Sequence, residues 1–165
     1  MVTLRAASGY VFVSLDLSPA YVGSAVTTMR RQVLWLQPDI FVIQDHVVSK
    51  TGTTQIWQLV MPAQPAIGAS SAGVNAGGHT IVATRQSSSI GAWTARNLMS
   101  SPDKDFSGGW VLEQAQPGGD QMFLTVISLD NAKQPSMNDI VFTDGGVSFM
   151  FGGKQITLTP GIDPT

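Results

Sequence analysis

The sequence has 165 residues, nine Lys and Arg against eleven Asp and Glu, a formal net charge of -2, and no cysteine. This length can bury one hydrophobic core without disulfides or a structural metal, so we expect a single domain over residues 1–165. The lack of cysteine excludes thiolate metal sites and cysteine nucleophiles, and the near-neutral charge provides no basic field for nucleic acid or an anionic membrane.

Strands dominate the predicted secondary structure, because few segments place apolar residues at helical spacing and Gly, Ser and Thr recur every few residues. We therefore predict an all-β fold, an antiparallel two-sheet β-sandwich of roughly ten or more strands. In chain order, apart from two hairpin regions, the expected strands are 10–17, 54–61, 79–84, 108–115 and 121–129. Turn-rich joints are expected at 50–53, 72–78, 100–109 and 116–120.

The stretch RRQVLWLQPDIFVIQDHV, residues 30–47, predicts a hairpin with a two-residue turn at Pro38 and Asp39. Both faces near the turn are apolar. The hairpin is therefore either the central strand pair of stacked sheets or a ribbon whose outer face packs on a layer outside this chain. The expected opposing pairs are Leu36–Phe41, Leu34–Ile43 and Gln32–Asp45 on one face, and Trp35–Val42, Val33–Gln44 and Arg31–His46 on the other.

The C-terminal run NDIVFTDGGVSFMFGGKQITL, residues 138–158, predicts a three-stranded meander with turns at Asp144-Gly145 and Gly152-Gly153. Its alternation gives one core face and one mostly polar face. On the core face we expect two rows, Ile140, Phe149 and Ile156 in one and Phe142, Val147 and Leu158 in the other.

Residues 16–65 resemble the start of the β-sandwich domain that follows the helical toroid in the heparinase II/III-like family of polysaccharide lyases. An aspartate-leucine and tyrosine pair, an arginine-led strand, an apolar Pro-Asp turn, a strand ending in Asp, and a tryptophan strand followed by Pro carry the resemblance. A Gly-rich turn, a polar Trp strand and the segment FLTVISL continue in a compatible order, so the likeness spans most of the chain.

The resemblance implies a C-terminal supporting domain excised from a larger periplasmic or extracellular lyase, although no secretory signal is visible in the sequence. In that family the catalytic residues lie mostly in the preceding helical domain, so the chain alone is expected to be non-catalytic. Its partners would be that helical domain and an acidic, uronic-acid polysaccharide, with no nucleic acid and no membrane. The alternative is an independent carbohydrate-binding or interaction module without catalysis.

Five residues are candidates for carbohydrate contact. Trp93 and Trp110 lie in polar surroundings, and an exposed indole face can stack on a sugar ring. The basic or imidazole side chains that could meet an acidic polysaccharide are Arg31, His46 and His79.

Several members of this family bind a metal in this domain through an aspartate at the end of the second hairpin strand and histidines on neighbouring strands. Asp45 occupies the matching position, but residues 28–30 and Val60 stand where histidines are expected. Asp45 is therefore the one candidate for a divalent metal such as zinc, and we expect no cofactor. The competing interpretation is a buried carboxylate held by Arg30 or Gln32.

Catalytic patterns are missing from the chain itself. Asp45 and His46 are adjacent, and neighbours on a strand point to opposite faces, so they do not form an acid-base dyad. No G-x-S-x-G motif surrounds any serine, and Glu113 is the only glutamate, which makes a carboxylate pair for glycoside hydrolysis hard to assemble.

Overall fold

The computed structural model describes residues 2–85, 91–98, 109–130, 132, 141–143, 146–151 and 153–158. These residues contain fourteen strands and one short 3-10 helix, which confirms the predicted all-β class. The strands are β1 (Val2–Ala7), β2 (Tyr10–Asp16), β3 (Val26–Leu36), β4 (Ile40–Ser49), β5 (Thr54–Met61), β6 (Ala66–Ile67), β7 (Ser71–Ala76), β8 (His79–Arg85), β9 (Trp93–Asn97), β10 (Trp110–Pro117), β11 (Asp120–Leu129), β12 (Val141–Thr143), β13 (Gly146–Phe151) and β14 (Lys154–Leu158); the helix is η1 (Ser18–Tyr21).

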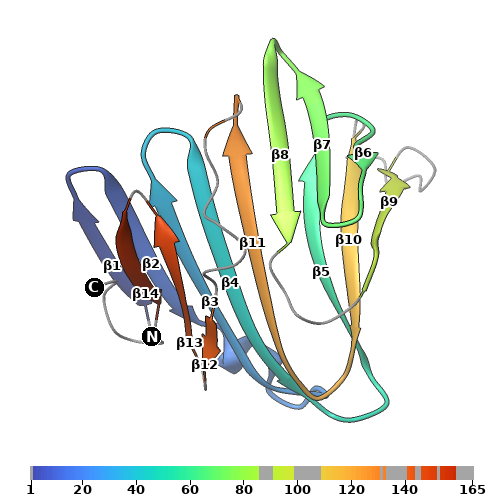
Figure 1. Cartoon of the computed structure of the whole chain (residues 1–165). Helices are drawn as coiled ribbons and strands as arrows, with labels where there is room; N and C mark the ends of the chain where they lie inside the picture. The colour runs from blue at the N-terminus through green and yellow to red at the C-terminus, as the bar shows by residue number, and fades with distance from the viewer. Residues whose placement is uncertain are drawn as a thin grey trace.

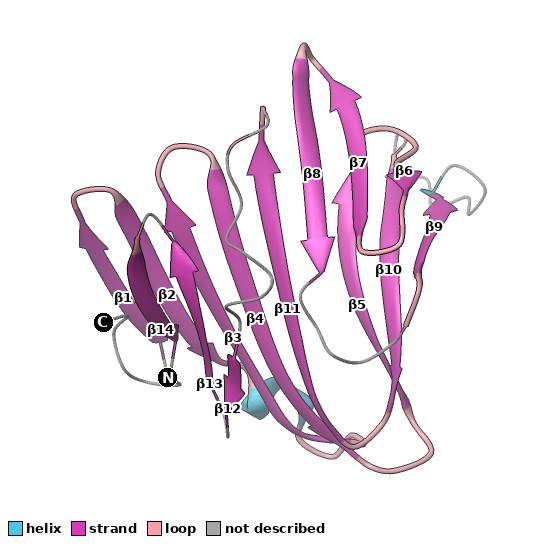
Figure 2. Cartoon of the chain, viewed as in Figure 1, coloured by secondary structure: helices cyan, strands magenta, loops and turns pink. Residues whose placement is uncertain are grey.

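The strands form an antiparallel β-sandwich around one large sheet (Figures 1 and 2). This sheet has eight strands in the order β1-β2-β3-β4-β11-β8-β7-β6. Two three-stranded sheets, β5-β10-β9 and β12-β13-β14, pack against it. No helix in the described part of the chain is both long enough and apolar enough to cross a membrane.

The two small sheets cover opposite faces of the large one. Leu124 and Phe123 are neighbours on β11, so their side chains point to opposite faces. Leu124 belongs to a core with Phe149 of β13, whereas Phe123 belongs to a second core with Trp57 of β5. Figure 1 shows β12–β14 over the β1–β4 end of the large sheet and the β5, β9 and β10 strands at the other end.

The first core is built by a row of side chains across four adjacent strands. Phe12 pairs with Leu34, Leu34 with Val42, and Val42 with Val126, and all four are almost completely buried. Burying each such side chain contributes roughly 1.5–3 kcal/mol before the entropy of ordering the chain is counted. This row, covered by Phe149, fixes the register of the sheet centre.

The predicted register of the β3–β4 hairpin is wrong by one residue. Leu36 pairs with Ile40 across a three-residue loop, and the two-residue Pro38-Asp39 turn is not formed. A one-residue shift on one strand exchanges its faces, so every expected partner changes. The observed pairs are Leu36–Ile40, Leu34–Val42 and Gln32–Gln44 on one face, and Trp35–Phe41, Val33–Ile43 and Arg31–Asp45 on the other.

The C-terminal meander follows the predicted pairing. Phe142 pairs with Val147, Val147 with Leu158, and Phe149 with Ile156. Phe149 is buried in the first core, as its place in the pattern predicts. Ile140, the Asp144-Gly145 turn and Gly152 lie outside the described residues.

Four observed strands are missing from the predicted plan, namely β1, β6, β7 and β9. The segment 72–78, expected as a joint, contains most of β7, and its Ala72 and Val74 are buried in the second core. The glycine that made it look like a turn, Gly73, sits inside the strand, and the turn comes later at Gly77 and Gly78, both with positive φ. Strand β1 was not predicted; it forms the edge of the large sheet and pairs with β2.

Candidate functional site

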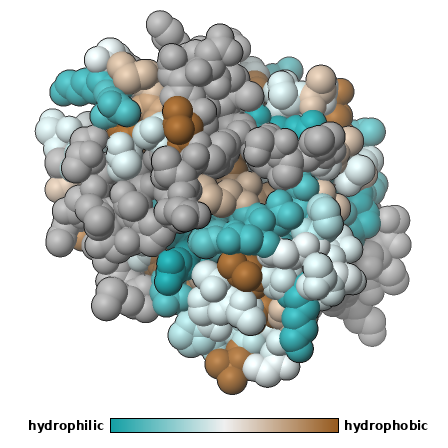
Figure 3. Space-filling model, turned by 60° about the horizontal axis from the view of Figure 1, so that its bottom comes forward, coloured by the Kyte–Doolittle hydropathy of each residue, from teal (hydrophilic) through white to brown (hydrophobic). Residues whose placement is uncertain are grey.

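A cavity of about 660 Å³ lies between η1, the ends of β3 and β4 nearest η1, and β5. Figure 3 views the molecule with the η1 end turned forward and shows hydrophilic and hydrophobic side chains interleaved on this face. The cavity is lined by Leu17, Tyr21, Ser24, Ala25, Val26, Met29, Arg31, Asp45, Val47, Ser49, Thr53, Thr54, Gln55, Ile56, Trp57, Gln58 and Phe123.

A bidentate ion pair lies in the cavity wall. Arg31 donates from Nε to Oδ1 of Asp45 at 2.6 Å and from Nη2 to Oδ2 at 2.7 Å. The Asp45 side chain is 2% exposed and that of Arg31 is 36% exposed, so the carboxylate is buried and the guanidinium reaches the surface. The hydrogen bonds to Asp45 raise the pKa of Arg31 above its usual range, while burial acts in the opposite direction.

Asp45 is thus a buried, paired carboxylate, but its partner is neither Arg30 nor Gln32. Arg31 faces Asp45 directly because of the one-residue difference in register, whereas Arg30 faces His46 and Gln32 faces Gln44.

The residues around Asp45 do not fit a zinc site. Both carboxylate oxygens already accept charge-assisted hydrogen bonds from Arg31. A structural or catalytic zinc needs three or four N, O or S ligands, and no group of three or more His, Asp or Glu in the described residues could supply them. His46 is on the opposite face of β4, where its Nε2 lies 2.8 Å from Asp120 Oδ1.

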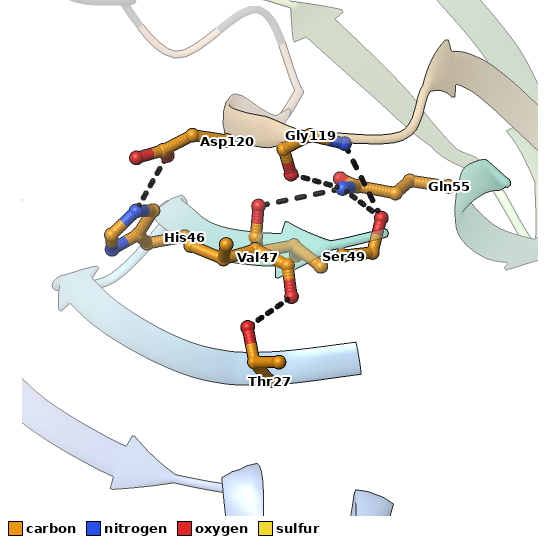
Figure 4. A network of polar contacts seen from close by, with 8 residues as sticks. Thr27, His46, Val47, Ser49, Gln55, Gly119 and Asp120 are labelled. Atoms are coloured by element: carbon orange, nitrogen blue, oxygen red, sulfur yellow. Dashed lines mark hydrogen bonds and ion pairs between the residues drawn. The ribbon is translucent and has the colours of Figure 1, made fainter. Parts of the chain in front are cut away.

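A polar network connects β4, β5 and the β10–β11 turn (Figure 4), and three of its members, Ser49, Thr53 and Gln55, line the cavity. Gln55 donates from Nε2 to the hydroxyl of Ser49 at 2.8 Å and to the carbonyl of Gly119 at 2.9 Å. Ser49 in turn lies 2.9 Å from the Thr53 hydroxyl. The Gln55 side chain therefore joins β4, β5 and the β10–β11 turn. Sequence reasoning missed it, although Gln55 shares its alternation with Trp57 and Met61, which was the available signal.

His79 lies far along the chain from the cavity, at the start of β8, and is exposed. Its Nδ1 lies 2.7 Å from Oδ2 of Asp130. The hydrogen bond to Asp130 raises the pKa of His79, and the same contact, with a second hydrogen bond from the Thr80 backbone, lowers the pKa of Asp130.

We predict a pH-dependent contribution from the His79–Asp130 pair. The pKa of His79 is raised in the folded state. The contribution of His79 to stability is therefore complete below pH 6.5, its usual pKa, and is lost as the pH rises through the folded pKa. The pKa of Asp130 is lowered in the folded state. The contribution of Asp130 to stability is therefore complete above pH 3.8 and is lost as the pH falls through the folded pKa. Thermal melting should show His79→Gln slightly less stable than wild type between pH 3.8 and 6.5, and equally stable in alkali. A pH-independent difference would contradict this assignment.

The two tryptophans proposed for sugar stacking occupy different environments. Trp93 is 4% exposed and makes an edge contact with Trp57, their ring centroids 5.7 Å apart. Its ring has no free face for a sugar, so we leave it out of the proposed contacts. Trp110 is half-buried and packs on the same core.

A second surface feature lies on one face of β1–β4. Its side chains belong to neither of the two cores that the small sheets form with the large sheet. We call it the β1–β4 apolar surface: Leu4, Val11, Val13, Val33, Trp35, Phe41 and Ile43. Leu4 is 62% exposed and the others are half-buried. Trp35 and Phe41 stack with centroids 5.6 Å apart and nearly parallel rings. The apolar outer face expected of the hairpin is therefore present.

Among known proteins, the comparisons find a likeness in solved structures only. No family model matches the sequence, and no curated protein matches it. Among solved structures, it resembles the heparan sulfate lyase HepC from Pedobacter heparinus (16% identity, TM-score 0.63, 96% of this chain and 27% of that chain). It also resembles two heparinase III structures. The first is 13% identical with a TM-score of 0.68, and the match covers 96% of this chain and 27% of that chain. The second is 11% identical with a TM-score of 0.67, and the match covers 96% of this chain and 26% of that chain.

These matches show the fold: the chain has the architecture of a β-domain found in heparinase III and heparan sulfate lyase structures. It spans about a quarter of the length of those proteins.

Proposed function

We propose that this chain is the supporting β-domain of a heparinase II/III-like polysaccharide lyase. It packs through the β1–β4 apolar surface on a helical domain that carries the catalytic residues, and it helps to form the cleft for a uronic-acid polysaccharide. The parent enzyme acts in the periplasm or outside the cell. Arg31, His46, His79 and Trp110 remain proposed carbohydrate contacts within this assignment.

The single observation that carries the proposal is the near-complete match of this chain to about a quarter of each lyase. The β1–β4 apolar surface supports it independently. A continuous row of apolar side chains on an outer sheet face is unfavourable in water and is typical of a surface that another domain covers. An independent binding module would need exposed aromatic rings, and the burial of Trp93 removes one of the two candidates.

The activity test compares this chain with the full-length product of its gene on heparosan and heparan sulfate. β-Elimination at a uronic acid leaves an unsaturated product that absorbs in the ultraviolet. We expect absorbance to rise with the full-length product and to stay flat with the 165-residue chain. Product formation by the chain alone would overturn the supporting role, and an inert full-length product would overturn the assignment to a lyase.

The packing test uses Val13→Thr with Val33→Thr, which keeps the β-branched shape but adds two hydroxyls to the β1–β4 apolar surface. In the full-length product we expect melting several degrees lower; in the isolated chain we expect almost no change. The matched control is Ile56→Thr with Val60→Thr on the exposed face of β5, where both backgrounds should melt as wild type. Equal effects of the two double variants in the full-length product would contradict packing through β1–β4.

A further inference from the structure

Strand β5 has a backbone edge that faces away from its sheet. Among the described strands, β5 pairs with β10 alone. The Gly118 amide donates to the Thr53 carbonyl, and the next pair along the two strands contains Pro117, which has no N–H. Because hydrogen-bonded and non-hydrogen-bonded pairs alternate in an antiparallel ladder, every second residue of β5 directs its N–H and C=O away from β10. These outward residues are Thr54, Ile56, Gln58 and Val60.

The cavity beside η1 runs along this edge. Five consecutive residues of β5, 54–58, line it. Because the side chains of a strand alternate between its two faces, a cavity on one face would meet only every second residue, so contact with all five places the cavity at the backbone edge.

Strands β3 and β4 form the floor of the cavity. Past the register shift near the start of β3, their lining residues do alternate, which is the pattern of one sheet face. These residues are Met29, Arg31, Asp45, Val47 and Ser49. The cavity is therefore a trough with the β5 edge as one wall and η1 as another.

The trough has the size of one added strand. A five-residue strand that takes its share of sheet width and layer thickness fills roughly 800 Å³, and the cavity measures about 660 Å³. Its floor carries no net charge, because Arg31 and Asp45 neutralise each other, and Val47 and Phe123 are apolar. A strand that lies here would direct uncharged side chains to the floor, since burying an unbalanced charge is costly.

The geometry favours a segment of the parent protein over a second copy of this chain. The β5 edge is recessed between η1 and the floor, so two such edges cannot meet without collision of their walls. In contrast, Val2 at the start of β1 lies in one row of the large sheet with Leu15, Arg31 and Asp45. Since adjacent strands are about 4.8 Å apart, about five extended residues reach from Val2 to β4.

We propose that the segment preceding β1 in the parent protein lies in this trough as an extended strand and pairs through its backbone with the free edge of β5. This inference rests on the proposed function, which supplies the preceding chain. It goes further by extending the sheet β5-β10-β9 to four strands and by naming the edge that is used. The β1–β4 apolar surface stays available to the helical domain, because the trough begins at the next row, Arg31 and Asp45.

Hydrogen exchange measured by mass spectrometry tests the pairing in the full-length product of the gene and in the 165-residue chain. We expect the amides of 54–58 to exchange at least about tenfold more slowly in the full-length product, because the added strand bonds the outward N–H groups. The control is β9, the opposite edge of the same sheet, which should exchange equally in both proteins. Equal exchange of 54–58 would overturn the proposal.

Two proline variants locate the contact. Ile56→Pro removes an outward N–H without removing a β5–β10 hydrogen bond, and Val60→Pro does the same on β5 outside the cavity. The probe is a synthetic peptide of the roughly ten residues that precede residue 1 in the full-length product, titrated into the ¹⁵N-labelled chain. Wild type and Val60→Pro should bind it with a dissociation constant of about 0.1 mM, and Ile56→Pro about tenfold more weakly.

Equal binding by the two proline variants, or no binding by wild type, would overturn the proposal. Protection of 54–58 in the 165-residue chain that grows with its own concentration would identify a second copy as the occupant and would also overturn it. These results are separate from the activity test: an active full-length product with unprotected 54–58 contradicts the added strand alone, whereas an inert product with protected 54–58 contradicts the lyase assignment alone.

Discussion

Replacing Arg31 with methionine is expected to lower the free energy of unfolding by about 2–4 kcal/mol, because it leaves the buried Asp45 carboxylate without a counter-charge. Loss of one partner of a buried pair typically costs about 3–5 kcal/mol. The range here is set lower because Arg31 is 36% exposed and water reaches part of the guanidinium. Urea denaturation followed by tryptophan fluorescence measures the change.

The control for this prediction removes both charges. Arg31→Met combined with Asp45→Leu should recover most of the lost stability, since an apolar pair of similar size can replace a buried ion pair at little cost. The two single effects are therefore not additive. A single variant within about 0.5 kcal/mol of wild type would show that the pair contributes little and that the carboxylate finds water or another partner.

Replacing Gly118 with alanine is expected to destabilise the protein by about 3 kcal/mol, the upper end of the range for overpacking. A Cβ at Gly118 would collide with the Lys50 carbonyl oxygen and the Thr53 hydroxyl. Relief is difficult because the Gly118 amide also donates to the Thr53 carbonyl at 2.7 Å, which holds the β10–β11 turn against the β4–β5 turn. Thermal or urea denaturation measures the loss.

Gly68→Ala is the matched control for that substitution. A Cβ there would meet only Ser71 atoms, at 3.4 and 3.6 Å, which is ordinary contact, and its φ is not in the left-handed region. Its stability should change by less than about 0.5 kcal/mol. If Gly118→Ala and Gly68→Ala behave alike, the β10–β11 turn is less tightly fixed to the β4–β5 turn than the structure shows.

The sequence predicts strands well where two signals agree. Segment 54–61 alternates and ends in turn residues on both sides, and β5 has these bounds. The C-terminal pairing was predictable because short Gly-containing turns fix both register and side-chain faces. β7 was missed because Gly73 and small residues imitate a turn when the neighbouring strand is not known.

The candidate site was only partly predictable. Asp45 and Arg31 were both named as candidates from the sequence, but their pairing was not predicted. A two-residue loop at Pro38 and Asp39 would pair Arg31 with His46, whereas the observed three-residue loop pairs it with Asp45. The local sequence does not distinguish the two loop lengths. The cavity itself brings together η1, β3, β4, β5 and β11, so no local pattern encodes it. Gln55 was missed because a polar residue in a strand is normally interpreted as solvent-facing, whereas here it is buried and donates to the Ser49 hydroxyl and the Gly119 carbonyl.

The most direct test of the central claim, that β1–β4 packs on a helical domain, is oxidative footprinting of Trp35. The indole lies half-exposed on the β1–β4 apolar surface of the isolated chain, where it should be oxidised readily. In the full-length gene product we expect Trp35 to be protected at least about tenfold while Trp110, away from this surface, reacts equally in both. Equal oxidation of Trp35 in the two proteins would contradict the account.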